Sequence, residues 1–298
     1  MYNGIISIYK EKGYTSHDVV AKMRGILQQK KIGHTGTLDP DAEGVLPVCL
    51  GSATKLCDIL TEKDKEYIAV MRLGVVTDTQ DLSGTILSQN EVKVCLQEVE
   101  NAIMSFVGKY EQIPPMYSAL KVNGKKLYEI ARQGLEIERK PRSVMIHEIE
   151  IKNRNLPDIE FRVSCSKGTY IRTLCDDIGK KLGCGAAMAS LIRTRAGSFS
   201  LASTIPLSEL EKIRDRNEID QIVISVDSMF SKLSAVHVAE QNMKLLVNGN
   251  RFCLHHILEK RLFGDEEEVR VYSPEGRFFG VYTYEAMDSK FKPKKMFF

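Results

Sequence analysis

The stretch from residue 33 to residue 51 limits the possible fold of this chain more than any other segment. Glycines stand at positions 33, 36, 44 and 51, and prolines stand at positions 40 and 47. Because glycine and proline interrupt regular structure, we expect a structured loop here that leads into a buried segment at residues 45–50. Asp39 lies in this loop between Leu38 and Pro40, where the proline stiffens the backbone and can fix the direction of the carboxylate.

Two local interpretations of this loop do not require chemistry at Asp39. The segment from Gly33 to Gly36 could cradle a phosphate, but it matches neither the G-x-x-x-x-G-K-[ST] nor the G-x-G-x-x-G pattern of nucleotide-binding loops. An aspartate before a proline is also a common turn residue, because its side chain bonds to the nearby backbone. From the loop alone, a structural role for Asp39 is therefore favoured.

Short strands and amphipathic helices follow one another irregularly around the loop. Alternation at residues 65–74 predicts a strand with Tyr67 and the alternate residues through Leu73 on one face. Apolar residues at helical spacing follow Ser16, which we expect to cap the first helix. The irregular order favours an α+β fold over a doubly wound sheet. Further strands are expected at residues 4–9, 144–151, 160–166 and 186–194, and further helices at residues 92–106, 127–132 and 170–182.

A basic segment interrupts this pattern. Pro114 and Pro115 break the regular structure, and we expect residues 112–142 to form an insertion. Between residues 121 and 142 the chain has seven cations and three acids, an excess of +4 that is larger than the +3 of the whole chain. Charge alone leaves two interpretations open, a solvated basic face and a phosphate-binding surface.

The length of 298 residues fits two unequal domains, which we place at residues 1–232 and 233–298. The second is expected to be a small β domain, with strands at residues 269–272 and 277–282 on either side of a turn. The tail at residues 290–298 is expected to be frayed, with some capacity to bind RNA.

Several classes of protein are disfavoured by the sequence. The chain has no apolar stretch of the roughly 18 residues that a membrane span needs, and we expect a cytoplasmic location. The seven cysteines contain no C-x-x-C pair, and the six histidines do not join them in metal-ligand spacings. We therefore expect reduced cysteines and no metal.

A resemblance to a known family changes the interpretation of Asp39. Residues 31–40 (KIGHTGTLDP), 44–48 (GVLPV) and 51–55 (GSATK) closely resemble the signature of the bacterial TruB family of tRNA pseudouridine synthases. One departure is Ile192, where the family usually has the first of two consecutive arginines. The further matching blocks follow in family order within residues 4–200, at Lys65, Tyr67, Pro114-Pro115, Ser118-Ala119, Lys121-Val122, Tyr128, Ala131-Arg132 and residues 166–172.

The resemblance implies a cofactor-free isomerisation of uridine in which Asp39 is the nucleophile. Arg172 is then expected to pair with Asp39 and hold it ionised. Tyr67 is expected to stack on the flipped base and to take part in removing the proton at C5. Taken singly, each of these residues could also serve ordinary packing. The remaining contacts that we expect with the nucleotide are made by His34, Tyr170 and Leu191.

The resemblance also implies a partner and an architecture. The catalytic domain is expected to have a mixed, largely antiparallel sheet, with residues 112–142 gripping the T-arm stem-loop of tRNA and a PUA-like domain at residues 233–298. The protein is expected to act as a monomer on the T-loop uridine, after flipping it out of the stack. The expected contacts with the RNA backbone are made by Lys121, Lys125, Lys126, Arg132, Arg142 and Arg193.

Two other functions remain open at this point. A non-catalytic RNA-binding protein or tRNA chaperone would account for the basic segment and the small β domain without any turnover. An N-glycosidase that used Asp39 with Asp41 or Glu43 would release free uracil.

Overall fold

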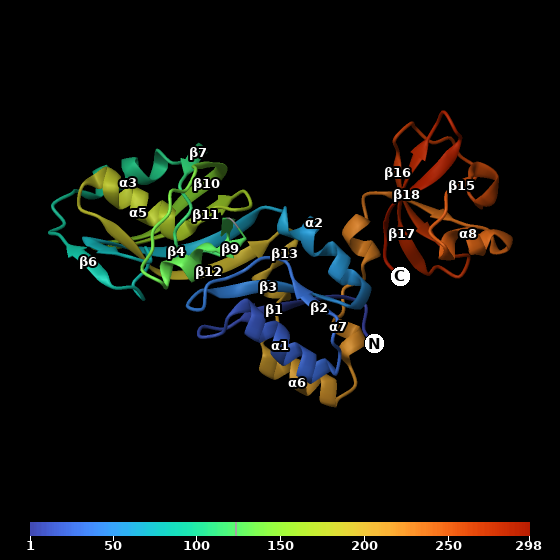
Figure 1. Ribbon diagram of the computed structural model, residues 1–298, viewed down its shortest axis with the longest axis horizontal. Helices are drawn as coiled ribbons and strands as arrows, with labels where there is room; N and C mark the ends of the chain where they lie inside the picture. Colours follow the sequence, from blue (N-terminus) through green and yellow to red (C-terminus); the bar gives the residue numbers. More distant parts are fainter. Residues whose placement is uncertain (123) are drawn as a thin grey trace.

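The computed structural model describes residues 1–122 and 124–298, and a nine-stranded sheet forms the centre of its larger part (Figure 1). β3 and β12 are parallel where they pair, whereas the other neighbouring pairs in this sheet are antiparallel. The expected α+β class with a mixed, largely antiparallel sheet is confirmed. The strands lie in the order β1 (Gly4–Lys10), β3 (Glu43–Leu50), β12 (Ala186–Ala196), β4 (Lys65–Leu73), β11 (Asp158–Cys165), β10 (Arg142–Asn155) and β7 (Gly108–Gln112), with β2 (Ile32–His34) on β3 and β13 (Phe199–Ser200) on β12.

Two pairs of helices bury different parts of this sheet (Figure 1). α1 (Ser16–Leu27) and α6 (Leu207–Asp215) pack on the apolar side chains of β1 and β3. α3 (Leu96–Met104) and α5 (Ile171–Leu182) pack on β4, β10 and β11. α5 ends at Gly183, whose φ of 76° allows the left-handed turn that closes the helix.

Two helix boundaries differ from the sequence prediction. The cap of α1 is Thr15, whose hydroxyl accepts a hydrogen bond from the Asp18 amide at 3.1 Å. Ser16 is the first helical residue, and its hydroxyl is directed at the loop that carries Asp39. α3 is shorter than expected because Cys95 begins it as the cap residue and Ser105 ends it.

The segment between Gln112 and Arg142 leaves the sheet between two neighbouring strands. Gln112 at the end of β7 lies opposite Arg142 at the start of β10. The described part of this segment, residues 113–122 and 124–141, holds the small hairpin of β8 (Lys121–Val122) and β9 (Lys125–Lys126) and the short helix α4 (Leu127–Ala131).

A second, five-stranded sheet forms the C-terminal part of the molecule. Its strands lie in the order β14 (Ser234–His237), β16 (Glu268–Tyr272), β17 (Phe278–Glu285), β18 (Lys290–Met296) and β15 (Phe252–Cys253), next to the short helix α8 (Met243–Val247). The expectation of a frayed tail was wrong, because β18 pairs with both β17 and β15. Phe291 of β18 is fully buried in the apolar cluster of this sheet, which helps to hold the tail in place.

The C-terminal residues also join the two parts of the molecule. Phe297 is buried in a cluster with Leu56 and Val226 of the larger part. The Lys55 ammonium donates hydrogen bonds to the carbonyl oxygens of Met296 and Phe298 at 3.0 and 3.3 Å. The chain end therefore fastens the small sheet to the larger part of the molecule.

The other short elements are η1 (Gly51–Leu56), α2 (Cys57–Thr61), β5 (Val75–Thr77), β6 (Ile86–Gln89), η2 (Leu201–Ser203), α7 (Ile219–Ile222), η3 (Asp227–Phe230), η4 (Glu240–Asn242) and η5 (Leu254–His256). Among the described helices, none is both long and apolar enough to cross a membrane.

Candidate active site

The loop between β2 and β3 holds Asp39 in place from two sides. On one side the Ser16 hydroxyl accepts a hydrogen bond from the Leu38 amide at 2.9 Å. On the other side the Lys10 ammonium donates to the carbonyl oxygens of Pro40 and Ala42 at 3.0 and 2.6 Å. Lys10 is fully buried, and burial lowers its pKa to about 8. The backbone on both sides of Asp39 is thus fixed by residues of β1 and α1.

Arg172, in the first turn of α5, forms a two-bond ion pair with Asp39. Arg172 Nε lies 3.0 Å from Asp39 Oδ2, and a second guanidinium nitrogen donates to Asp39 Oδ1 at 3.3 Å. The Arg172 side chain is 6% exposed, whereas the Asp39 side chain is 38% exposed. A buried guanidinium therefore presents a carboxylate that a substrate can still reach. The contact between the two side chains is the one that the family resemblance implied.

Three further groups position the Arg172 guanidinium. It donates to the carbonyl oxygens of Thr79 at 3.2 Å and Tyr117 at 2.9 Å. Its Nη1 atom lies 3.6 Å from Asp81 Oδ2. Asp81 was not predicted from the sequence, because nothing in the polar turn around it indicates a contact with an arginine of a distant helix.

The electrostatics of Asp39 balance two opposing effects. Burial raises the pKa of the Asp39 carboxyl, and the positive charge of Arg172 acts against this shift. The nearby carboxylate of Asp81 adds a smaller raising effect, while Lys10 adds a smaller lowering one. Arg172 is therefore the principal group that favours the ionised form of Asp39.

Tyr67 and Leu191 form a wall on the same face of the sheet. Leu191 of β12 lies opposite Ala69 of β4, and Tyr67 is two residues from Ala69 on the same face. Both side chains belong to the buried cluster that also contains Leu38, the neighbour of Asp39. Burial raises the pKa of Tyr67 to about 12, so its phenol is protonated at neutral pH.

Tyr170 precedes α5 and is held by Gln112. The Gln112 side chain donates to the Tyr170 carbonyl oxygen at 2.9 Å and accepts from the Tyr170 amide at 2.8 Å. Gln112 is 1% exposed and stands where the segment of residues 113–141 leaves β7. The Gln112 side chain therefore connects the start of that segment to the residue that precedes α5, the helix that carries Arg172. The sequence reasoning missed Gln112 as well.

Arg193 does not lie where an RNA contact requires it. The side chain is 1% exposed, and it donates to the carbonyl oxygens of Val45 at 2.7 Å and Gly36 at 3.2 Å. The expectation that Arg193 contacts the RNA backbone was therefore wrong for this structure, because its donors hold the Asp39 loop and β3 together. Ile192 points to the opposite face of β12 from Leu191, so the departure from the family pattern does not line the pocket wall.

His34 ends β2 and borders a hollow of about 530 Å³ that also contains His17, Arg24 and Lys31. The His34 and His17 rings meet edge to face, with 5.4 Å between their centroids. Burial lowers the pKa of His34 to about 4, so the imidazole is neutral.

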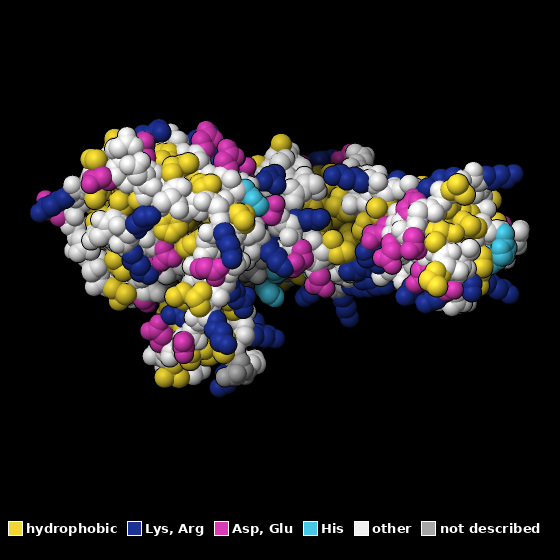
Figure 2. All heavy atoms as spheres, turned by 90° about the horizontal axis from the view of Figure 1, so that it is seen from above, with side chains coloured by type: hydrophobic (Ala, Val, Ile, Leu, Met, Phe, Trp, Pro, Cys, Tyr) yellow, Lys and Arg dark blue, Asp and Glu magenta, His cyan; other side chains and the backbone are white. Residues whose placement is uncertain are grey.

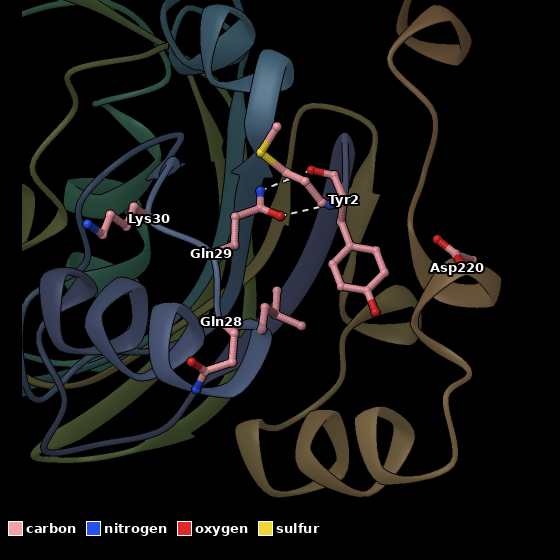
Figure 3. Close-up of a pocket in the computed structure, with 7 residues that line it drawn as sticks. Tyr2, Gln28, Gln29, Lys30 and Asp220 are labelled. Atoms are coloured by element: carbon pink, nitrogen blue, oxygen red, sulfur yellow. Dashed lines mark hydrogen bonds between the residues drawn. The ribbon is translucent and has the colours of Figure 1, made fainter.

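A second hollow of about 580 Å³ is lined by none of the predicted site residues (Figure 3). There the Gln29 side chain accepts from the Tyr2 amide at 2.8 Å and donates to the Tyr2 carbonyl oxygen at 3.0 Å. These bonds anchor the N-terminal strand to the end of α1, which is a structural role.

Most of the predicted RNA contacts are on the surface of the inserted segment. Lys121, Lys125, Arg132 and Arg142 are exposed, and Lys126 is half-buried. Figure 2 shows Lys and Arg side chains on the lobe that projects from the larger part of the molecule, together with acidic and apolar ones. The first residues of this segment lie beside the ion pair, because Gln112 contacts Tyr170 and Tyr117 contacts Arg172.

The sequence did not single out one group of residues that could ligate a metal ion. In the described part of the chain, Cys253, His255 and His256 bring their ligand atoms within 4.8 Å of one another. Their spacing, C-x-H-H, is not one of the common metal-ligand patterns. This group follows β15 in the C-terminal sheet region, whereas the loop between β2 and β3 that carries Asp39 is in the larger part of the molecule (Figure 1).

Comparisons with known proteins show the family to which the chain belongs. The model of the TruB family pseudouridylate synthase N-terminal domain matches residues 24–171, and that of the tRNA pseudouridylate synthase B C-terminal domain matches residues 172–231. The chain belongs to the TruB family of pseudouridine synthases. It is therefore an isomerase that forms pseudouridine.

Curated relatives match the chain over nearly its whole length. A protein named tRNA pseudouridine synthase B from Lachnoclostridium phytofermentans is 50% identical, with 99% of each chain covered. A protein of the same name from Bacillus pumilus is 41% identical, with 99% of this chain and 98% of the relative covered. A chain in the crystal structure of a Cbf5-Nop10-Gar1 complex is 26% identical, with a TM-score of 0.72 over 99% of this chain and 85% of that one.

Proposed function

We propose that this protein converts a uridine in the T-loop of tRNA, uridine 55 in tRNA numbering, to pseudouridine with Asp39 as the nucleophile. The two-bond ion pair between Asp39 and the buried Arg172 carries this proposal. The relatives at 41–50% identity are named for action on tRNA, which supports tRNA as the substrate class. The T-loop position rests on the resemblance to the TruB signature around Asp39.

The reaction needs no net oxidation, reduction or hydrolysis. The bond from ribose C1′ to uracil N1 breaks, the base turns, and a bond from C1′ to C5 forms while C5 loses a proton and N1 gains one. A carboxylate suits this task because it can attack C1′ or C6, or assist a glycal route. All three routes need an ionised Asp39, which is the state that Arg172 favours. We therefore propose a reaction without cofactor or metal.

The neighbouring side chains supply the pocket for the extruded base. Tyr67 is proposed to stack on the uracil, with Leu191 and Tyr170 as the other walls and His34 at the mouth. Since the Tyr67 phenol is protonated at neutral pH, its oxygen can take the C5 proton only while it passes its own proton on. The Arg193 guanidinium beside Tyr67 would favour the negative charge that develops on this oxygen.

The RNA is proposed to be gripped by residues 112–142 and by a PUA-like domain at residues 233–298. Flipping a stacked uridine costs a few kcal/mol, which backbone contacts and stacking in the pocket can offset. Lys121, Lys125, Lys126, Arg132 and Arg142 are proposed to supply the phosphate contacts. The H/ACA RNP structure with a bound substrate RNA, at 24% identity and a TM-score of 0.70, shares this fold.

The proposal places the protein in the cytoplasm as a monomer. Sedimentation of the free protein and of its complex with tRNA tests the oligomeric state. A dimer in both samples would contradict it.

The test of the proposed function uses an unmodified tRNA transcript and no added cofactor, with a chelator present. We expect pseudouridine at the T-loop uridine and no loss of base. Free uracil among the products would favour the glycosidase. RNA binding without any change in nucleoside composition would favour a non-catalytic binding protein or chaperone. Either result would overturn the proposal.

A further inference from the structure

Cys253, His255 and His256 lie together on one short turn of the C-terminal sheet region. The turn is η5 (Leu254–His256), which follows directly on β15. The ligand atoms of the three residues lie within 4.8 Å of one another. None of them takes part in the chemistry proposed for Asp39.

We propose that this trio is a binding site for a transition-metal ion that prefers thiolate and imidazole ligands, with Zn²⁺ as the best fit. Zinc binds cysteine sulfur at about 2.3 Å and histidine nitrogen at about 2.0–2.1 Å, which places neighbouring donors about 3.3–3.8 Å apart in a tetrahedron. Donors within 4.8 Å need only small rotations of their side chains to reach that geometry. A fourth position is left for water or for another ligand.

The backbone of the turn is already fixed, which lowers the cost of ordering the ligands. Phe252 is 1% exposed, and Leu254 packs against the same apolar cluster. On the other side of the turn the His256 carbonyl oxygen accepts from the Ala239 amide at 2.8 Å. Phe252 and Leu254 thus pack into the apolar cluster, whereas the His255 side chain is exposed.

Two hydrogen bonds within the turn bear on the chemistry of the ligands. Cys253 Sγ accepts from the main-chain amide of His256, and this bond orients the sulfur within the turn. The Cys253 amide donates to His256 Nδ1 at 3.1 Å. Because a neutral imidazole has one free lone pair, binding of the metal by His256 replaces this second bond. Cys253 and His255 are therefore the principal ligands, and His256 completes the site.

Cobalt(II) is the probe that tests the proposal, because a cobalt–thiolate bond gives a charge-transfer band in the near ultraviolet. The full chain, reduced and freed of any affinity tag, is titrated with Co²⁺ and then with Zn²⁺. We expect a band that saturates at one equivalent and disappears when one equivalent of Zn²⁺ is added. A titration without a saturable band would overturn the proposal.

Substitutions locate the site. Cys253→Ser should abolish the band, and His255→Ala should weaken binding by about tenfold or more. Cys95→Ser, at an exposed cysteine outside the trio, and His147→Ala should leave the titration unchanged. His255 is exposed, so His255→Ala is expected to fold and serves as the second test if Cys253→Ser does not. A band that survives in Cys253→Ser, or an unchanged affinity in His255→Ala, would contradict the assignment.

Discussion

Removal of the Arg172 charge is expected to move the pH at which the enzyme loses activity in acid. Burial raises the pKa of the Asp39 carboxyl, and Arg172 is the largest opposing influence. In Arg172→Met this opposition is lost, so the pKa of Asp39 rises further. Because the proposed reaction needs ionised Asp39, activity should then be lost at a higher pH than in the wild-type protein.

The geometry sets the size of this shift. Two unit charges about 4 Å apart interact by about 4 kcal/mol at an effective dielectric constant near 20, which corresponds to about 3 pKa units. The Asp39 side chain is 38% exposed, so solvent screens part of this interaction. We therefore expect a shift of about 1 to 2 units, within the range of about 1–3 units that an adjacent opposite charge produces.

The assay follows tritium released from C5-labelled uridine in tRNA under single-turnover conditions across the acid range. The acid limb is the part of the pH–rate profile in which activity falls as the pH is lowered. Arg172→Lys keeps a charge but loses the two-bond geometry, so its acid limb should lie between those of the wild type and Arg172→Met. Lys180→Met removes another cation from α5, one that pairs with Asp176, and should not move the limb. An acid limb in Arg172→Met at the wild-type pH would refute the role given to Arg172.

Three other perturbations test separate parts of the account. Gln112→Met removes both hydrogen bonds to Tyr170, so Tyr170 should be misplaced and kcat should fall by about 10–100-fold. The Kd for tRNA in a filter-binding assay should not change. An unchanged kcat would contradict the positioning role of Gln112. Tyr67→Phe keeps the ring but not the hydroxyl, so release of the C5 proton should slow by about 10²–10⁴-fold while RNA binding persists. If the variant and the wild type released the proton at the same rate, the hydroxyl would have no part in the reaction and only the ring would be functional. Lys10 has a folded pKa of about 8 against an ordinary value of 10.5, so the unfolded chain binds more protons between these values. Between pH 7.5 and pH 10, the free energy of unfolding of the wild type should therefore increase by up to about 3 kcal/mol more than that of Lys10→Met, as measured by denaturant titration. Equal changes in the two proteins would contradict the burial of this ammonium.

Local patterns in the sequence predicted much of the central sheet and its helices. Alternation at residues 65–74 indicated a strand with Tyr67 and its alternate residues on one face, and in β4 that face is buried. A helix was expected at residues 170–182, and α5 spans Ile171–Leu182. The family signature placed Asp39 and Arg172 together although 133 residues separate them, which no local pattern could do.

The errors share a physical cause, which is that contacts between distant segments override local tendencies. The charged tail at residues 290–298 looks frayed in isolation, but Phe291 enters the apolar core of the small sheet. Arg193 looks like a surface cation until it meets the carbonyl oxygens of Gly36 and Val45, which are 157 and 148 residues away in the chain. Asp81 and Gln112 were missed for the same reason, because their partners are in α5 and in the residue before it.

The most direct test of the central claim compares Asp39→Asn with Asp41→Asn, which alters an exposed carboxylate of the same loop. Both variants and the wild type are incubated with unmodified tRNA, and pseudouridine and bound RNA are measured in the same samples. We predict that Asp39→Asn binds tRNA with the wild-type Kd and forms no pseudouridine, while Asp41→Asn forms it at the wild-type rate. Pseudouridine formed by Asp39→Asn at the wild-type rate would contradict the assignment of Asp39 as the nucleophile.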